Sequence, residues 1–261
     1  MSEADGTVRI AAMSDVHYGK TSQGTLQSVF ADVTKNADVL VLCGDLTDYG
    51  LPEEAQALAK DLTAVKIPIV AVLGNHDFES GNEHEVAKAL TDVGVAVLDG
   101  DAVEIAGVGF AGVKGFAGGF GRGALGAWGE PSIKAFVHEA IEEALKLENA
   151  LARLRTPARV AVLHYAPIRA TVEGEPIEIY PWLGSSRLEE PLGRYEVHAV
   201  FHGHAHKGSP QGTTAKGVPV YNVALPLLRE RYPERPPYLL LEVPRRHIAL
   251  ADERIVERRR A

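Results

Sequence analysis

The sequence contains very few of the residues on which small secreted domains depend. Among 261 residues there is one cysteine, Cys43. A single cysteine allows no internal disulfide, which excludes the disulfide-stabilised secreted folds. Cys43 ends an apolar run that begins at Val39, and this context predicts a small core residue rather than a reactive thiol. The cysteine usage fits a reducing compartment, and we expect a cytoplasmic protein.

Long apolar runs are also missing. No stretch approaches the roughly 18 residues of a membrane span, and the apolar run in the N-terminal segment MSEADGTVRIAAMSDVH is too short for a signal peptide. The formal net charge is -8, which disfavours a nucleic-acid partner because phosphate backbones recruit Lys and Arg. A phosphate substrate remains compatible with this charge, since bound cations reverse the sign of the local field. No particular oligomeric state is favoured.

Apolar runs of strand length, by contrast, recur along the whole chain. In the first third they alternate with helical periodicity, with strands predicted at 8–13, 39–43 and 67–73 and helices at 25–37 and from Pro52 onward. This alternation predicts parallel strands joined by crossover helices. The remaining predicted elements are a helix at 83–93, antiparallel additions or a second sheet over 95–113, a long helix capped by Ser132 and ending near Arg155, and strands at 159–163, 197–201, 218–223 and 238–243. With 46% hydrophobic residues, we expect one α/β domain over residues 1–261.

Polar motifs follow five of these predicted strands directly. They read SDVH (14–17), GDLTD (44–48), GNHD (74–77), HYA (164–166) and GHAH (203–206). Because ligands of open α/β sheets bind at the carboxyl ends of the strands, we expect these motifs to meet at one edge. The side chains expected there are Asp15, His17, Asp45, Asn75, His76, His164, His204 and His206.

Carboxylate and imidazole groups together suit Zn, Fe or Mn, and side chains two residues apart in a turn can reach one ion. Each motif has an ordinary explanation as well, because D-x-H also occurs in surface turns and a single histidine such as His164 is commonly a buried structural residue. The joint occurrence at successive strand ends favours one metal site. Two ions held about 3.5–4 Å apart are the arrangement used for displacement at phosphorus. His202 is expected on the opposite side of its strand, as a structural residue.

In this order and spacing, the motifs resemble those of the calcineurin-like metallophosphoesterase superfamily, whose pattern is D-x-H, G-D-x-x-D, G-N-H-[ED], a single H and G-H-x-H. The resemblance extends from Asp15 to His206, and it is strongest to compact bacterial phosphodiesterases and phosphatases. It implies a four-layer α/β/β/α sandwich of two mixed sheets and two metal ions, drawn from Mn, Fe and Zn.

The resemblance also implies a role for each residue. One ion is expected to bind Asp15, His17, Asp45 and His206, and the other Asp45, Asn75, His164 and His204, with Asp45 bridging the two. His76 is the expected transition-state stabiliser or leaving-group acid, Asp77 is expected to orient His76, and Asp48 to hold the turn or a ligand histidine. Asn75, His76 and Arg122 are the expected substrate contacts.

The function implied is hydrolysis of a small phosphate ester, either diester or monoester. A water or hydroxide activated between the ions would attack phosphorus in line, and His76 would assist departure of the alkoxide. The alternative is a binding scaffold, since some relatives keep the fold but lose metal ligands. That alternative requires missing ligands, and in this sequence every motif is intact.

Two long loops and the C-terminal tail remain to be assigned. Residues 112–130 hold eight glycines, so this segment is either a substrate-selecting loop, with Lys114 and Arg122 near aromatic residues, or an ordinary connector. Residues 165–187 follow a predicted metal ligand directly and are expected to border the site. The tail, residues 245–260, alternates in charge and is expected to be a solvated terminal segment.

Overall fold

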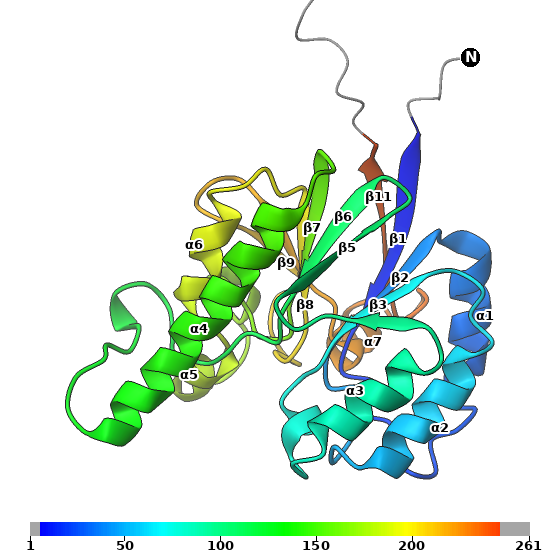
Figure 1. Cartoon of the computed structure of the whole chain (residues 1–261), viewed down its shortest axis with the longest axis horizontal. Coiled ribbons are helices and arrows are strands. Elements are labelled where there is room, and N and C mark those ends of the chain that lie inside the picture. The colour runs from blue at the N-terminus through cyan, green and yellow to red at the C-terminus, as the bar shows by residue number, and fades with distance from the viewer. Residues whose placement is uncertain (1–5, 246–261) are drawn as a thin grey trace, which may run out of the picture.

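The computed structural model describes residues 6–245, and the predicted tail segment lies almost wholly outside them. The described chain forms two β-sheets that face one another (Figure 1). The first sheet has the order β11 (Leu239–Pro244), β1 (Thr7–Met13), β2 (Val39–Cys43), β3 (Ile69–Val72) and β4 (Val95–Val97). The second has the order β5 (Asp101–Ile105), β6 (Val108–Gly112), β7 (Ala158–Val162), β8 (Ala199–His202), β10 (Pro219–Asn222) and β9 (Gln211–Thr213).

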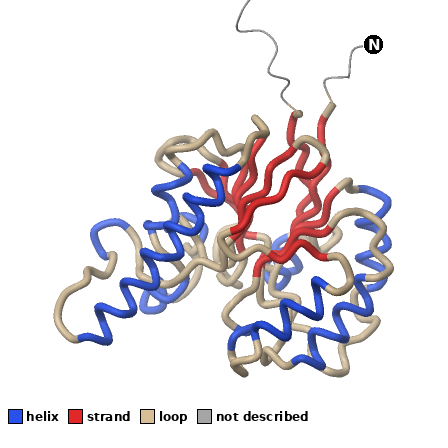
Figure 2. Tube along the Cα trace, in the orientation of Figure 1, coloured by secondary structure: helices blue, strands red, loops and turns tan. Residues whose placement is uncertain are grey.

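Both sheets are mixed. In the first, β11 runs antiparallel to β1 while the other pairs are parallel. In the second, the central strands are parallel and both edge strands are antiparallel. Helices cover both outer faces, as Figure 2 shows. The helices are α1 (Gln27–Asn36), α2 (Pro52–Leu62) and α3 (Glu83–Thr91) on the first sheet, α4 (Pro131–Arg153), α5 (Tyr180–Leu183) and α6 (Glu189–Leu192) on the second, and α7 (Leu225–Arg231) after β10.

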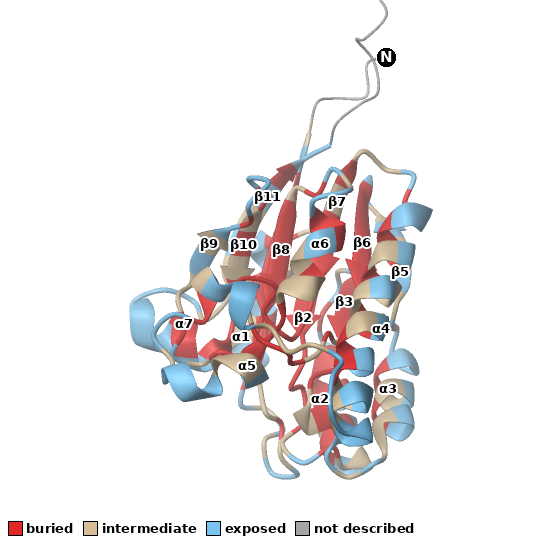
Figure 3. Cartoon of the chain, turned by 90° about the vertical axis from the view of Figure 1, so that its left-hand side faces the viewer, coloured by how far each residue is buried: buried red, intermediate tan, exposed pale blue. Residues whose placement is uncertain are grey.

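Three apolar layers hold the sandwich together. Period-two alternation along β1 directs Ala11 and Met13 toward the helices of the first sheet and Ile10 and Ala12 toward the second sheet. A third cluster lies between the second sheet and α4. Figure 3 shows the resulting burial of both sheets. The expected four-layer α/β/β/α sandwich of two mixed sheets is therefore confirmed.

Several element boundaries differ from the prediction for identifiable reasons. The long helix begins at Pro131, with Glu130 as its N-cap residue, so Ser132 lies inside the first turn and is not the cap. Proline is favoured at the first helical position because it has no N–H to leave unpaired. Strand β3 begins at Ile69 rather than at residue 67, because Pro68 has no N–H to donate to the ladder.

The segment 95–113 contains both of the features that were considered for it. β4 adds a parallel strand to the first sheet, and the chain then crosses over to form the antiparallel β5–β6 hairpin, which begins the second sheet. Within residues 6–245, no helix is both long and apolar enough to cross a membrane.

Candidate metal centre

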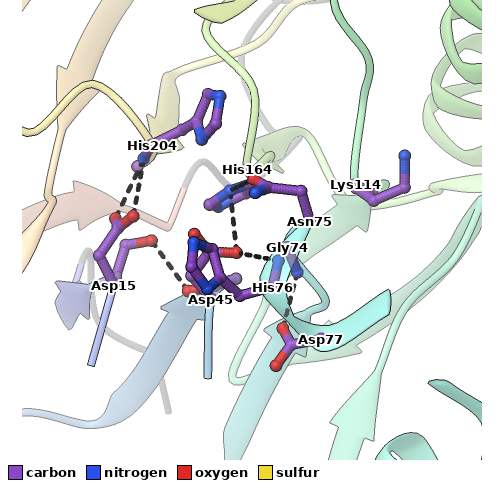
Figure 4. A network of polar contacts seen from close by, with 12 residues as sticks. Asp15, Asp45, Gly74, Asn75, His76, Asp77, Lys114, His164 and His204 are labelled. Atoms are coloured by element: carbon purple, nitrogen blue, oxygen red, sulfur yellow. Dashed lines mark hydrogen bonds and ion pairs between the residues drawn. The ribbon is translucent and has the colours of Figure 1, made fainter. Parts of the chain in front are cut away.

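The site lies where the carboxyl ends of the two sheets meet. Ser14, directly after β1, donates from Oγ to the carbonyl of Cys43 at the end of β2 (2.6 Å). The same carbonyl lies 2.9 Å from Nδ1 of His164, which follows β7 in the other sheet. These contacts hold the strand ends of both sheets around one centre, shown in Figure 4.

The expected ligands gather in groups in which the ligand atoms all lie within 4.8 Å of one another. Asp15, His17 and His206 form the first group. Nε2 of His206 is 2.9 Å from Oδ1 of Asp15, and the rings of His17 and His206 are 5.5 Å apart. The backbone N–H of His204 donates to both carboxylate oxygens of Asp15, at 3.1 and 3.0 Å. This contact fixes the orientation of the carboxylate.

Asp45, His164 and His204 form another group, with Asn75 beside it. Nε2 of His164 is 2.9 Å from Oδ1 of Asn75 and 3.3 Å from Oδ1 of Asp45. Its Nδ1 faces the Cys43 carbonyl, so Nε2 is the nitrogen directed at the oxygens of Asn75 and Asp45.

Asp45 stands between the two groups. Its Oδ1 faces His164, while its Oδ2 is 3.9 Å from Nε2 of His17. Nε2 of His17 is buried and has no hydrogen-bond partner among the described residues. A buried polar atom without a partner is costly, and Nε2 of His17 belongs to a group of side chains that could hold a cation.

The pKa values follow from burial and from these neighbours. Burial acts to lower the pKa of His164, but Asp45, through its charge and hydrogen bond, and Asp15 together raise it to about 9. Burial and the positive charge of His164 lower the pKa of His204 to about 4. Burial raises the pKa of Asp45, but the charge of His164 and a hydrogen bond with it outweigh burial, so the net pKa is lowered.

The backbone at the site adopts a conformation that side chains usually avoid. Asp15, His17, Asp45 and His204 have positive φ values of 56°, 43°, 48° and 68°. Left-handed backbone at residues other than glycine is uncommon, and it collects at functional sites where the surrounding structure enforces it. These four residues lie in three of the strand-end motifs, SDVH, GDLTD and GHAH.

Asp77 makes hydrogen bonds that the sequence did not predict, and its expected action on His76 stays a prediction. Its fully buried carboxylate accepts hydrogen bonds from the N–H groups of Leu46, Thr47 and Gly74 and from the Thr47 hydroxyl, at 2.6–3.2 Å. Burial raises the pKa of Asp77 more than the hydrogen bonds from Gly74 and Thr47 lower it. Asp77 thereby joins the turn that carries Asp45 to the turn that carries Asn75.

The ring of His76 is fixed by another residue. Its Nδ1 is 2.7 Å from the backbone carbonyl of Asp48, and its backbone N–H donates to Oδ1 of Asp45 at 2.9 Å. The Asp48 carboxylate is 3.7 Å from Nδ1 of His17, which agrees with its expected place beside a ligand histidine. The contact between the Asp48 carbonyl and His76 was not predicted, because a backbone carbonyl leaves no signal in the sequence.

His202 lies in β8, fully buried. Its Nδ1 is 2.8 Å from the Gly203 carbonyl and its Nε2 is 2.8 Å from the Thr171 hydroxyl. Burial lowers its pKa to about 4. Both ring nitrogens are therefore engaged within the protein, as expected for a structural histidine.

The two long loops form one unit. Gly118 and Gly119, both at positive φ, donate to the carbonyls of Pro181 and Gly184 at 2.7 and 2.8 Å. Nε2 of His204 lies 3.2 Å from the Trp182 carbonyl, so this unit reaches the metal ligands. Arg122 is exposed in the 3₁₀ turn η2 (Gly121–Gly123), and its expected contact with substrate stays a prediction.

The comparisons with known proteins agree with this geometry. Residues 8–208 match the model of a family described as calcineurin-like phosphoesterase. A probable metallophosphoesterase of Methanocaldococcus jannaschii is 32% identical over 98 residues, 38% of this chain and 46% of that protein. The match thus spans about half of the relative's length.

Two solved structures share the fold. Phosphopantetheinyl hydrolase from Mycobacterium tuberculosis is similar with a TM-score of 0.65 at 18% identity, over 91% of this chain and 97% of that chain. A protein of Thermus thermophilus gives a TM-score of 0.54 at 15% identity, over 92% of this chain and 100% of that chain. At such identities the likeness concerns the fold alone.

Proposed function

This chain belongs to the calcineurin-like phosphoesterase family, and we propose that it hydrolyses small phosphate esters, diesters or monoesters, with the help of two metal ions. The observation that carries the proposal is the excess of acceptor atoms at the strand ends. Nε2 of His17 is buried without a partner among the described residues, and Nε2 of His164 faces oxygens of Asn75 and Asp45. Cations satisfy all of these atoms together.

Asp15, His17, Asp45 and His206 would hold one ion, and Asp45, Asn75, His164 and His204 the other. Asp45 is the shared ligand because its two oxygens face different histidines. Mixed imidazole and oxygen ligands suit Mn, Fe or Zn. When bound, the ions would neutralise charge on the phosphoryl oxygens and lower the pKa of the attacking water.

His76 is the proposed proton donor to the leaving oxygen. The Asp48 carbonyl 2.7 Å from Nδ1 fixes the ring, so Nε2 is the nitrogen free to hold and deliver a proton. The hydrogen bond from the His76 backbone to Asp45 ties the position of the ring to that of the shared ligand. Asn75, the residue before His76, would touch both an ion and the substrate.

Metal content and hydrolysis test the proposal together. We expect purified protein, reconstituted with Mn, to bind two ions per chain by plasma mass spectrometry and to hydrolyse a chromogenic phosphodiester. His17→Ala removes the unpaired nitrogen and should lose an ion, whereas His202→Gln, at a histidine outside the cluster, should keep both if the variant folds. One ion or none in the wild-type protein would contradict the proposal, as would metal loading without any phosphoesterase activity.

A further inference from the structure

Lys114 lies in an aromatic enclosure beside the metal centre. Its Nζ is 5.3 Å from the ring centroid of Phe78, 5.0 Å from that of Phe116 and 5.4 Å from that of Tyr165. A cation over aromatic faces is attracted by their quadrupoles. Three rings from three separate segments therefore hold this ammonium group in one place.

The enclosure is built from the segments that carry the metal ligands. Phe78 ends the 3₁₀ turn η1 (His76–Phe78), and the Lys114 carbonyl accepts from the N–H groups of His164 and Tyr165 at 3.0 and 3.1 Å. The Tyr165 ring is 4.5 Å from the ring of His204. Because the same ring is 5.4 Å from Nζ, Nζ lies within about 10 Å of His204. Figure 4 shows Lys114 on the side of the cluster where Asn75 lies.

The ammonium group of Lys114 forms no ion pair within residues 6–245. Burial lowers the pKa of Lys114, and the negative charges of Glu143 and Glu139 offset this only in part. An ammonium group has three donors, and the hydrogen bond found for Nζ within residues 6–245 goes to the Gly115 carbonyl (2.9 Å). No carboxylate in that part of the chain forms an ion pair with it. Glu143, the nearby buried acid, accepts from the Gly115 N–H (2.7 Å) and pairs with Lys146 (2.7 Å) instead.

From this geometry we propose that Lys114 binds a second anionic group of the substrate, a phosphate or carboxylate separate from the phosphate under attack. The inference rests on the proposed function and narrows it to esters whose organic part carries its own negative charge. Glu143 acts as a positioning residue, because it accepts a hydrogen bond from the backbone N–H of Gly115, the residue that follows the lysine. The rings attract the ammonium group without a counter-ion. The Nζ donors that do not bond to the Gly115 carbonyl therefore stay available to the ligand.

Non-hydrolysable phosphonates separate the two anionic groups. Propylphosphonate carries only the group that the metals would bind, and 3-phosphonopropionate adds a carboxylate at the end of a chain of similar length. We expect metal-loaded wild-type protein to bind 3-phosphonopropionate about tenfold more tightly in calorimetric titration, as a charge-assisted hydrogen bond provides. Phosphonoacetate and 4-phosphonobutyrate, shorter and longer by one methylene, identify the reach of the lysine.

Lys114→Met should abolish this preference while affinity for propylphosphonate and metal content stay unchanged. Lys66→Met, at an exposed lysine, is the matched control and should keep the preference. If Lys114→Met lowers the melting temperature, Lys114→Gln is used in its place. This inference, but not the proposed function, would be overturned if wild-type protein bound propylphosphonate and 3-phosphonopropionate equally tightly. An equal loss of affinity for both ligands in Lys114→Met would have the same consequence. Absence of metal-dependent binding of any phosphonate would overturn the proposed function and this inference with it.

Discussion

Replacement of Asp77 by asparagine tests whether this carboxylate holds the site together or acts on His76. Oδ2 of Asp77 accepts from the Gly74 N–H at 2.8 Å, while Oδ1 accepts from Thr47. In Asp77→Asn an amide NH₂ replaces one of these oxygens. If the remaining oxygen keeps the Thr47 contacts, the NH₂ faces the Gly74 N–H. Two buried hydrogen-bond donors then face one another, and neither has an acceptor in that contact.

The magnitude follows from the loss of one charge-assisted hydrogen bond, the burial of an unpaired N–H and the weakening of the other contacts. Together these amount to about 3 kcal/mol of unfolding free energy. For a domain of this size, that corresponds to a melting temperature lower by roughly 6–12 °C. Metal affinity should fall as well, because the turns carrying Asp45 and Asn75 lose the side chain that joins them.

The assay is urea denaturation in the presence of a chelator, which removes the contribution of bound metal. Asp92→Asn is the matched control, since Asp92 is exposed and forms a local ion pair with Lys88 of α3. This substitution should change stability by less than about 0.5 kcal/mol. If Asp77→Asn leaves stability and metal content at wild-type values and lowers only turnover, Asp77 acts through His76 and our reasoning is refuted.

Four further substitutions follow from the same geometry. Asp45→Ala should remove both ions and Asp15→Ala only one, because Asp45 alone faces both groups of ligands; equal stoichiometry in the two variants would contradict a bridging Asp45. His76→Ala should lower turnover about 10²–10⁴-fold with normal metal content. His76 also lies within ligand distance of His17 and Asp45, so loss of an ion in this variant would make it a ligand instead. Gly203→Ala should lower metal affinity and cost about 1–3 kcal/mol, because a Cβ there would collide with Ser14 and Asp15; an unchanged dissociation constant for Mn would count against this.

Local pattern was sufficient to locate the ligands along the chain. Each motif directly follows an apolar run of strand length, and the change from apolar residues to Asp, Asn and His marks where the run stops. The positions of Asp15, Asp45 and Asn75 at strand ends therefore depend on neighbouring residues alone. The layers were predictable for a similar reason, because strand and helix periodicities are local properties.

Contacts between distant segments could not be obtained in this way. Leu46 and Thr47, which donate to Asp77, come from a turn about 30 positions earlier in the chain. The rings around Lys114 come from residues 78, 116 and 165. The hydrogen bonds from the glycine-rich loop to residues 181–184 likewise join segments far apart in the sequence, and the two interpretations of this loop both stay predictions. Such pairings arise only when strands pair and the two sheets pack, which brings the loops at their ends together.

By itself, the sequence determined the family motifs, their order and the strand ends on which they lie. The tertiary structure alone decided that Nε2 of His17 and of His164 faces the Asp45 carboxylate, that Asp45 stands between two groups of candidate ligands, and that Asp77 joins two turns. The physical reason is that a residue type and its spacing specify which atoms can bind a cation. The direction of a side chain depends on left-handed turns, such as that at Asp45 (φ 48°), which packing from the opposite sheet enforces.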